Sequence, residues 1–551
     1  MQRKSIKRTL RRIDGRGYKA YKELVGAEES IRGVRVSVTR VQGDPFAPPS
    51  MVEVKGVISD LGDLLKWSIP LSDFLLRILY RELKKRSTKE GEGRSGYLGV
   101  PRPSNIIIRR SSLELEKNGE FTARVWVGLP SRRRRINAGA AEEMLLRRIP
   151  EAFRAALTEL RSQKEKAEEH VRTWRMQEFI RSMLPEKGLV SFVGNGAILP
   201  RRCGGCEDPL PNAVPFESPP SLEASFTLPW GEEIRGMGVR RGVTVIAGAA
   251  FHGKTTLAQA IAAGVWNHIP GDGREKVVTI REAMCVSTEE GRFIASVDVS
   301  PLIHNLPRGP DTTCFTTTSA SGATSVAAGV QEAVEAGAKL LILDEDLVAT
   351  NILYSDDRAA SITSRSTVTP IFQVAKSMSE KGVSLIIVSA GNLPMLAAAD
   401  TVIVMEDYKP TDRTSVAANL VKKYGLHVKH SKYMLPKDRV LVRMPEMKKP
   451  KIRGLRLEDK LLEAPVDIKY NQQLVEETQL NTLLALLMFT KRRGIGKTMK
   501  NIAKEIDELM KKGFNSIAGK RIGPGLGEIR GLDLIYLLNR LPGIVVRQVS
   551  S

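Results

Sequence analysis

The strongest constraint on this chain is residues 243–257, Val-Thr-Val-Ile-Ala-Gly-Ala-Ala-Phe-His-Gly-Lys-Thr-Thr-Leu. The β-branched run at 243–246 predicts a buried strand, and the residues after the glycine-lysine pair suit a helix start. Between the two, the segment fits Gly-x-x-x-x-Gly-Lys-Ser/Thr, whose backbone N–H groups face phosphates. The segment therefore predicts a phosphate-binding loop made of Gly248, Ala249, Ala250, Phe251, His252, Gly253, Lys254, Thr255 and Thr256.

Three residues of this loop have expected roles. Lys254 would contact the β- and γ-phosphates of a nucleotide, and the Thr255 hydroxyl would bind Mg²⁺. His252 is expected to be a spacer that points away from phosphate, because such a loop works through its backbone. The alternative is an ordinary glycine-rich strand–helix turn. A second Gly-Lys-Thr, at 496–498, fails the full pattern because position 491 is Lys, so a basic helix start is expected there.

A second apolar run, Leu-Leu-Ile-Leu at 340–343, is followed at once by Asp344, Glu345 and Asp346. Asp344 is expected to complete the Mg²⁺ shell, and Glu345 to polarise the attacking water. Taken alone, the segment would sooner indicate a buried strand that ends in a solvated acidic turn. Paired with the upstream loop, it favours catalysis, with Lys254 and Glu345 as the catalytic residues and ATP and Mg²⁺ as cofactors.

Between these segments lies a serine- and glycine-containing turn at 319–325, followed by a helical run at 326–336. By itself such a turn is typical of a helix N-cap. Its spacing is more informative, because Ser321 lies twenty-three positions before Asp344. ABC ATPases place a Ser-Gly-Gly-Gln-type signature, a helix and then the acidic strand at about this separation. The signature candidates are Ser321, Gly322, Ala323, Thr324 and Ser325.

Short segments in order along roughly residues 8–410 resemble one known family, the predicted ATPases of the ABC class, which lack transporter membrane segments. The resemblance implies a two-lobed cassette that sandwiches two ATP molecules between two copies, and hence a homodimer. The signature amides would then contact the γ-phosphate held by the opposite copy. Some members of the family are linked to RNA. The segments that carry the resemblance are 44–50, 192–201, 252–255, 267–275, 290–292, 297–301, 321–325, 344–346 and 349–351.

The resemblance also implies further site residues. Glu289, Glu290 and Arg292 occupy the position of the glutamine loop of transporters, and Thr350 and Asn351 that of the loop contacting the other subunit. Where transporters keep a switch histidine, this chain has Ser-Ala-Gly-Asn at 389–392, so Ser389 or Asn392 is the candidate γ-phosphate sensor. Ala323 replaces the second signature glycine, which requires a backbone conformation that alanine tolerates.

The length of 551 residues predicts two or three domains, because single hydrophobic cores stop growing at about 250–300 residues. Residues 1–190 mix both periodicities: apolar residues recur at helical spacing within 74–83, residues 121–127 alternate like a strand, and one long helix is expected from Pro150 to about Glu178. Short apolar strands alternate with helices over 240–405, which favours a parallel α/β sheet. We therefore expect an α/β fold: a basic N-terminal α+β domain (1–190), a central ABC-type P-loop ATPase domain (191–410) and a basic, mainly helical C-terminal domain (411–551).

The net charge of +23 is unevenly distributed. Lys and Arg exceed Asp and Glu by 16 over residues 1–190 and by 13 over 401–551, whereas acids exceed bases by 6 in between. Basic flanks around an acidic centre favour a polyanion partner, although a hyperthermophile-like basic surface is the alternative. The sharpest basic run is expected in a turn after a strand: Arg132, Arg133, Arg134 and Arg135.

Two functions remain open at this point. The first is an ATP-driven dimer clamp on nucleic acid, RNA in particular. The second is a mechanical or regulatory ATPase that acts on a protein partner, which the low aromatic share of 5% keeps open because base stacking needs aromatic rings.

Four cysteines do not make a disulfide scaffold and fit a reducing compartment. Cys203 and Cys206 form one Cys-x-x-Cys without a second pair at zinc spacing, so a plain loop or an occasional disulfide is expected there before a metal site. No apolar window approaches the ~18 residues of a membrane span. A cytoplasmic protein without a membrane partner is the expectation.

Overall fold

The computed structural model describes residues 4–307, 309–355, 366–425, 429–518 and 522–549. The chain forms two compact units. Unit 1 contains Met1–Trp174, Glu476–Thr482 and Lys512–Glu528, and unit 2 contains Arg175–Val475, Leu483–Lys511 and Ile529–Ser551. The three domain boundaries expected from the sequence stay a prediction.

Unit 1 is built on a seven-stranded sheet with the order β1-β2-β3-β4-β8-β5, in which β7 also pairs with β8. The central pair is antiparallel over its whole length, from Ser50 opposite Val127 to Val57 opposite Glu120. Along β3, buried valines alternate with more exposed polar residues, which gives the sheet one core face and one polar face; on β8 the alternation is weaker, since Arg124 is also buried. The strands are β1 (Lys4–Ser5), β2 (Ala27–Ile31), β3 (Val34–Arg40), β4 (Ser50–Val57), β5 (Leu98–Gly99), β7 (Leu113–Leu115) and β8 (Glu120–Val127).

The core face of this sheet shares one hydrophobic cluster with helices α1 to α4. Phe121 of β8 stacks on Phe153 of α4 with ring centroids 5.8 Å apart. The helix predicted around 74–83 and the strand predicted at 121–127 are both confirmed. The helices are α1 (Ile6–Ile13), α2 (Ser68–Arg86), α3 (Ala138–Glu143), α4 (Ile149–Ser162) and the short α14 (Asn515–Ala518), and a π-helical turn at Met144–Arg148 joins α3 to α4.

The single helix predicted from Pro150 to about Glu178 is wrong in one respect, because the chain forms two helices, α4 and α5 (Lys164–Met183). The backbone leaves helical geometry at Gln163, where φ is −107° and ψ is 32°. Beside the break, the Ser162 hydroxyl donates to the Glu159 carbonyl at 2.9 Å. A serine that hydrogen-bonds the main chain in this way competes with helix continuation.

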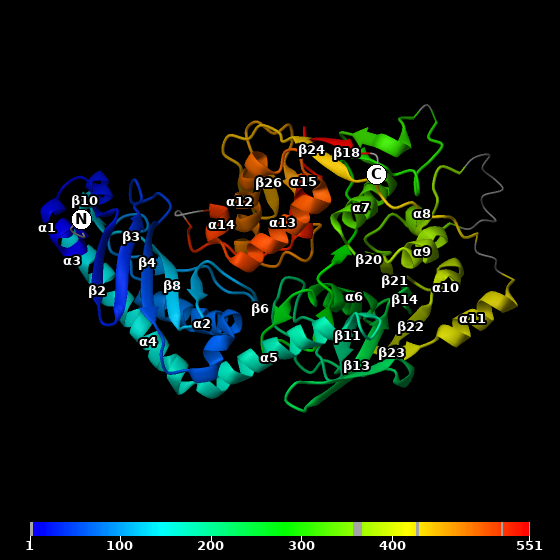
Figure 1. The fold of residues 1–551 in the computed structure, drawn as a ribbon, viewed down its shortest axis with the longest axis horizontal. Helices are drawn as coiled ribbons and strands as arrows, with labels where there is room; N and C mark the ends of the chain where they lie inside the picture. Colours follow the sequence, from blue (N-terminus) through cyan, green and yellow to red (C-terminus); the bar gives the residue numbers. More distant parts are fainter. Residues whose placement is uncertain (1–3, 308, 356–365, 426–428, 519–521, 550–551) are drawn as a thin grey trace. The chain divides into compact units, whose positions relative to one another are not determined.

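Unit 2 contains the predicted parallel sheet, with the order β17-β20-β21-β14-β22-β23. All neighbours except the last pair are parallel, as the alternation of apolar runs and helical segments predicts. Helices α6 and α9 pack against β14 and β21 (Figure 1). The strands are β14 (Val243–Ala247), β17 (Ala283–Cys285), β20 (Leu340–Asp344), β21 (Ser384–Val388), β22 (Thr401–Glu406) and β23 (Lys409–Asp412). The helices are α6 (Lys254–Ala263), α7 (Gly322–Ala336), α8 (Thr350–Leu353), α9 (Ile371–Glu380), α10 (Leu393–Ala398) and α11 (Thr414–Lys423).

A second, antiparallel sheet of unit 2 has the order β12-β13-β11-β16. Its strands are β11 (Leu189–Gly194), β12 (Glu223–Thr227), β13 (Glu233–Arg240) and β16 (Val277–Thr279). A separate antiparallel pair is formed by β18 (Ile294–Val297) and β19 (Phe315–Thr317).

The chain after residue 430 contains strands as well as the expected helices. Gly513, with φ at 85°, directly follows helix α13 (Met499–Lys512) and ends it. The elements are β24 (Arg439–Arg443), β25 (Lys451–Arg453), β26 (Arg456–Glu458), β27 (Val466–Asp467), α12 (Glu477–Arg493), α13 (Met499–Lys512), α15 (Gly531–Leu538) and β28 (Val545–Gln548). Throughout the described part of the chain, no helix has the length and apolarity needed to cross a membrane.

Candidate functional site

The predicted phosphate loop connects a fully buried strand, β14, to helix α6. Two of its glycines have positive φ, 133° at Gly248 and 91° at Gly253. A Cβ at Gly248 would lie 2.4 Å from the Met405 carbonyl oxygen, so this position has no room for a side chain. Gly253 is the N-cap of α6, and its left-handed conformation directs the chain from the loop into the helix. The loop thus leads directly into a helix N-terminus, which attracts phosphate.

The side chains of the loop point in different directions. Lys254 Nζ donates to the carbonyl oxygens of Gly248 and Ala249, both at 2.8 Å, so the ammonium group lies over the loop. Phe251 is 94% exposed and has a φ of 67°. His252 Nδ1 accepts from the backbone N–H of Asp407 at 2.8 Å, which directs its ring toward the β22–β23 turn.

Sequence reasoning did not single out Tyr408, in that same turn. Its ring is 57% exposed, and a Cβ at Gly253 would lie 3.4 Å from the tyrosine Cδ1 atom. The backbone of Tyr408 has a φ of 67°, and a non-glycine residue in this region is frequently functional. Its position beside the loop could be found only from the pairing of β22 with β23.

The acidic strand β20 brings Asp344 to the phosphate loop. Thr255 lies beside the Asp344 carboxylate, and both Thr255 and Lys254 favour its charged form. Burial raises the pKa of Asp344 above its usual range, although the Asp346 N–H and Thr255 oppose this. A hydroxyl and a carboxylate in contact are oxygen donors of the kind that Mg²⁺ takes alongside phosphate oxygens, so the residues fit that cation.

The neighbouring strand β21 positions the other catalytic candidate. The Glu345 carboxylate accepts hydrogen bonds from the Ala390 N–H at 2.8 Å and from Asn392 Nδ2 at 3.1 Å. Ser389, fully buried, donates its N–H to the Ile246 carbonyl of β14 at 3.0 Å. The loop after β21 therefore contacts Glu345 through Asn392, and through Ser389 it contacts the strand that leads into the phosphate loop.

The signature segment forms the first turn of α7. Ser321 is the N-cap, and its hydroxyl accepts from the Thr324 N–H at 3.4 Å. Ala323 lies within the helix, a conformation that suits alanine. The Ser325 hydroxyl donates to the Gly322 carbonyl at 2.7 Å and accepts from the Glu289 N–H at 2.9 Å. The signature turn and the Glu289 segment are thus hydrogen-bonded to each other.

The loop after β20 reaches the same cluster. A Cβ at Gly322 would lie 3.3 Å from Glu290 Oε1 and 3.5 Å from the Cβ of Ala349. The Ala349 N–H donates to Thr288 Oγ1 at 2.8 Å, just before Thr350 and Asn351 begin α8. Candidates from three separate segments, 288–292, 321–325 and 349–351, therefore gather at the start of α7.

Two of these candidates, Glu289 and Arg292, form buried ion pairs. The sequence identified only one partner of each pair. Arg292 donates both Nη atoms to Glu332 of α7, at 3.2 and 2.9 Å. Glu289 is bound by Arg540, whose Nε donates to Glu289 Oε2 at 2.7 Å. Burial would raise the pKa of Glu289, but Arg540 outweighs it and holds the pKa below the usual range.

The arginine run lies in unit 1, at the tip of a two-stranded hairpin formed by β9 (Ser131–Arg132) and β10 (Arg135–Ile136). Arg133 and Arg134 occupy the turn with φ of 49° and 58°. All four arginine side chains are exposed, which leaves their guanidinium groups accessible to a partner.

Cys203 and Cys206 pair with each other as a disulfide in the connector between β11 and β12. Within the described residues, no group of three or more His, Cys, Asp or Glu side chains forms a metal site.

Comparison with known proteins decides the family. The P-loop domain model of the ABC ATPases matches residues 163–439, and the model for the N-terminal part of ATPases of the ABC class matches residues 3–160. The chain belongs to the ATPases of the ABC class. Its fold is accordingly a mixed α/β one, with an N-terminal domain of this family and a central P-loop ATPase domain.

An uncharacterised protein of Methanocaldococcus jannaschii is 31% identical to this family member over 245 residues, which is 42% of this chain and 54% of the relative. The chain therefore spans about half the length of the curated relative that it matches. Among solved structures, a Clostridium perfringens component of an ABC transporter complex is 19% identical and has a TM-score of 0.25, with 44% of this chain and 96% of that chain covered. The ADP form of an ATP-binding cassette of an ABC transporter is 11% identical with the same TM-score, over 42% and 95% of the two chains.

Proposed function

We propose that this chain binds and hydrolyses ATP at the edge of the parallel sheet of unit 2. The observation that carries the proposal is the convergence of Lys254, Thr255, Asp344 and Glu345 where β14 and β20 end. Ligands of open parallel sheets bind at the carboxyl ends of the strands. The start of α6 and the Lys254 ammonium group supply positive charge for the β- and γ-phosphates.

Thr255 and Asp344 would hold Mg²⁺ at this site. The cation, when bound, neutralises phosphate charge during the transfer. The Thr255 side chain and the Asp344 carboxylate lie together beside the loop, so two oxygen ligands are available there. Cations of this kind need only one or two protein ligands when substrate phosphates supply the others.

Glu345 would orient the attacking water and accept its proton. As the water oxygen bonds to the γ-phosphorus, the bond to the bridging oxygen breaks and leaves ADP and phosphate. The Ala390 N–H and the Asn392 amide hold the Glu345 carboxylate in place, which fixes its orientation before the substrate arrives. Asn392, which contacts Glu345 directly, is the better of the two sensor candidates.

The form of the signature turn supports a homodimer that encloses two ATP molecules. The first turn of α7 presents free backbone N–H groups, and Ser321 and Gly322 stand at its tip. Such a terminus suits the γ-phosphate bound by a second copy. Release of phosphate from ATP by the purified chain, dependent on Mg²⁺, tests the proposal. A preparation that binds no ATP would overturn it.

A specific surface supports the second part of the proposal, that unit 1 binds nucleic acid, and RNA in particular. The polar face of its sheet lines a groove of about 1290 Å³. Arg35 and Lys55 are direct cross-strand partners, so two cations lie side by side there, and Lys55 Nζ also pairs with Glu53 at 3.0 Å. Cations outnumber acids along the groove, and those that line it include Arg35, Lys55, Arg109, Lys117, Arg124 and Lys512.

Few aromatic side chains line this groove, so phosphate contact is favoured over base stacking. The exposed arginine hairpin belongs to the same unit. Adding single- and double-stranded RNA and DNA to the ATPase assay at two salt concentrations tests this part. Stimulation by RNA that weakens with salt is the expected result. DNA stimulation would change the ligand, and no effect from any nucleic acid would favour the protein-partner alternative.

A further inference from the structure

The C-terminal chain, residues 440–551, lies beyond both matched family regions yet contributes to both units. Glu476–Thr482 and Lys512–Glu528 belong to unit 1, whereas Leu483–Lys511 and Ile529–Ser551 belong to unit 2. The chain therefore passes repeatedly from one unit into the other. Helix α12 makes one of these passages without a break, since it begins at Glu477 and ends at Arg493.

In unit 2, this chain binds the segments that surround the signature turn. Arg540 follows α15 and is 6% exposed, and its guanidinium pairs with Glu289. Its Nη1 atom also lies 3.7 Å from Glu332 of α7. The Tyr536 hydroxyl donates to Glu289 as well, at 3.3 Å. Arg540 thus holds the Glu289 segment and the signature helix in one arrangement.

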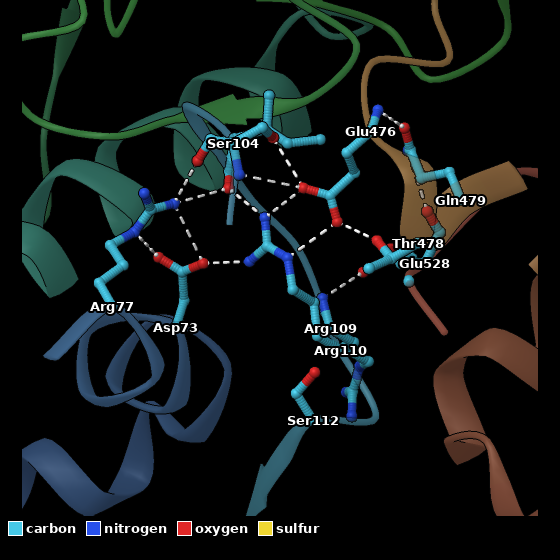
Figure 2. A network of polar contacts seen from close by, with 12 residues as sticks. Asp73, Arg77, Ser104, Arg109, Arg110, Ser112, Glu476, Thr478, Gln479 and Glu528 are labelled. Carbon is cyan, nitrogen blue, oxygen red and sulfur yellow. Dashed lines mark hydrogen bonds and ion pairs between the residues drawn. The ribbon is translucent and has the colours of Figure 1, made fainter. Parts of the chain in front are cut away.

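In unit 1, the same chain is held by a second buried ion cluster, shown in Figure 2. Arg110 donates to both carboxylate oxygens of Glu476, at 2.9 and 2.8 Å, and pairs with Asp73 on its other side. The Ser104 hydroxyl donates to Glu476 at 2.7 Å. Arg110 is 2% exposed and Glu476 is 9% exposed, so both charges lie out of water.

Buried ion pairs of this kind specify position more than they add stability. Taking charges out of water costs free energy that the pairing only partly returns, whereas misplacing one partner leaves an uncompensated buried charge. The chain is therefore held in a single register in each unit. Helix α12 starts directly after Glu476 and continues without a break into the part of the chain that belongs to unit 2, so a displacement at one end of this helix reaches its other end.

We propose that the C-terminal chain is a mechanical link of this ATPase, which transmits changes at the signature turn through Arg540 and Glu476 into unit 1. The inference rests on the proposed function, because it requires that ATP binds beside the signature turn. Glu476 and Arg540 are positioning residues here and contact neither nucleotide nor nucleic acid.

Hydrogen exchange of the full chain, with and without ATP and Mg²⁺, tests the link. The Glu345→Gln background is used so that ATP persists. We expect ATP to change hydrogen exchange in the unit 1 segment 104–124. Glu476→Gln should reduce this change by about fivefold, because mutations along a coupled network alter the coupling by about that factor. ATP affinity should stay within about twofold of the parent, because Glu476 is remote from the loop in sequence and belongs to unit 1.

Three further variants keep the experiment decisive. Ser104→Ala removes one hydrogen bond to Glu476 and is the milder substitution if Glu476→Gln folds poorly. Asp60→Asn breaks an exposed ion pair with Arg161 in unit 1 and is the matched control, which should leave the ATP-dependent change intact. Arg540→Gln should act like Glu476→Gln from the other end.

Each outcome decides between the possibilities. A purely structural brace would raise exchange without ATP and leave the ATP-dependent difference unchanged. That result, or a parent in which ATP binds without any change in unit 1, overturns the link and leaves the ATPase proposal standing. Failure to bind ATP, measured directly by calorimetry, overturns the proposed function instead.

Discussion

The carboxylate of Glu345 accepts a hydrogen bond from the side-chain amide of Asn392 at 3.1 Å. The two residues are forty-seven positions apart and are brought together by the parallel pairing of β20 with β21. Asn392 also approaches the Ser389 hydroxyl at 3.5 Å. The segment without a switch histidine therefore still places a polar amide next to the residue that we assign to water activation.

Asn392→Ala should lower kcat by about tenfold or more, since one fixed hydrogen bond to a catalytic group contributes on the order of 1.4 kcal/mol or above. The KM for ATP should change little, because Asn392 contacts Glu345 and lies outside the phosphate loop. Steady-state phosphate release at several ATP concentrations measures both. Ser389→Ala removes the other sensor candidate and keeps the Asn392 amide, so it serves as the comparison variant. Equal losses in the two variants would argue against a special role for Asn392.

Lys254→Ala should abolish ATP binding or turnover, with a loss of about 100-fold or more in kcat/KM, because the loop loses its cation facing the phosphates. Calorimetric titration with ATP and Mg²⁺ measures the binding. Lys497→Ala, in the Gly-Lys-Thr that fails the loop pattern, is the control and should leave ATP affinity unchanged. Turnover at the parent rate in Lys254→Ala would refute the site.

Glu345→Gln should retain ATP, because the carboxylate positions water and is not required for phosphate binding. The trapped nucleotide should then hold two copies together as a dimer. Mass measurement in solution with ATP, with ADP and without nucleotide tests this expectation. A strictly monomeric mass in the presence of ATP, or rapid turnover by the variant, would contradict the dimer mechanism.

Much of the candidate ATP site, at the ends of β14 and β20, can be predicted from the sequence, because local patterns specify it. The strands that contain 243–246 and 340–343, the glycines at 248 and 253 and the helix after Ser321 all follow from short-range patterns. The position of the C-terminal chain cannot be predicted in this way. Arg110 and Glu476 are 366 positions apart, and no local pattern links them. The apolar residues of α12 indicate a helix, but they do not indicate in which of the two units the helix packs.

The pKa of Asp73 makes the stability of unit 1 sensitive to acid. Burial would raise the pKa of this carboxyl, but Arg77 and Arg110 outweigh it and hold the pKa well below its usual range. A lowered pKa in the folded state means that the unfolded state binds the proton more tightly. The stabilisation is therefore complete above the unfolded pKa of about 3.9, and it is lost as pH falls from there toward the folded pKa.

Asp73→Asn should therefore destabilise unit 1 at neutral pH by about 3 kcal/mol, because Arg110 loses one of its buried partners. Its stability should also fall less steeply with pH below about 4 than that of the parent, by up to about 1.4 kcal/mol per pH unit. Pulse proteolysis of unit 1 in urea at a series of pH values measures both effects. Asp60→Asn, at an exposed pair, should change neither by much. If the stability of Asp73→Asn falls with pH as steeply as that of the parent, other groups cause the acid sensitivity.

The last prediction concerns the exposed arginine hairpin. If unit 1 holds a phosphate backbone, each neutralised phosphate releases counterions, and log affinity should fall linearly with log salt by about 0.7 per contact for a single strand. Replacing Arg132, Arg133, Arg134 and Arg135 with alanine should flatten this slope and weaken binding to unrelated RNA sequences about equally, because phosphate contacts do not read bases. ATP affinity should remain near that of the parent, since Lys254 belongs to the other unit. A variant with alanine at four exposed arginines of unit 2, Arg202, Arg235, Arg240 and Arg241, controls for the loss of net charge. Binding measured by fluorescence anisotropy at several salt concentrations decides the matter. An affinity independent of salt, or no detectable RNA or DNA binding at low salt, would discard the nucleic-acid proposal and leave a protein partner as the alternative.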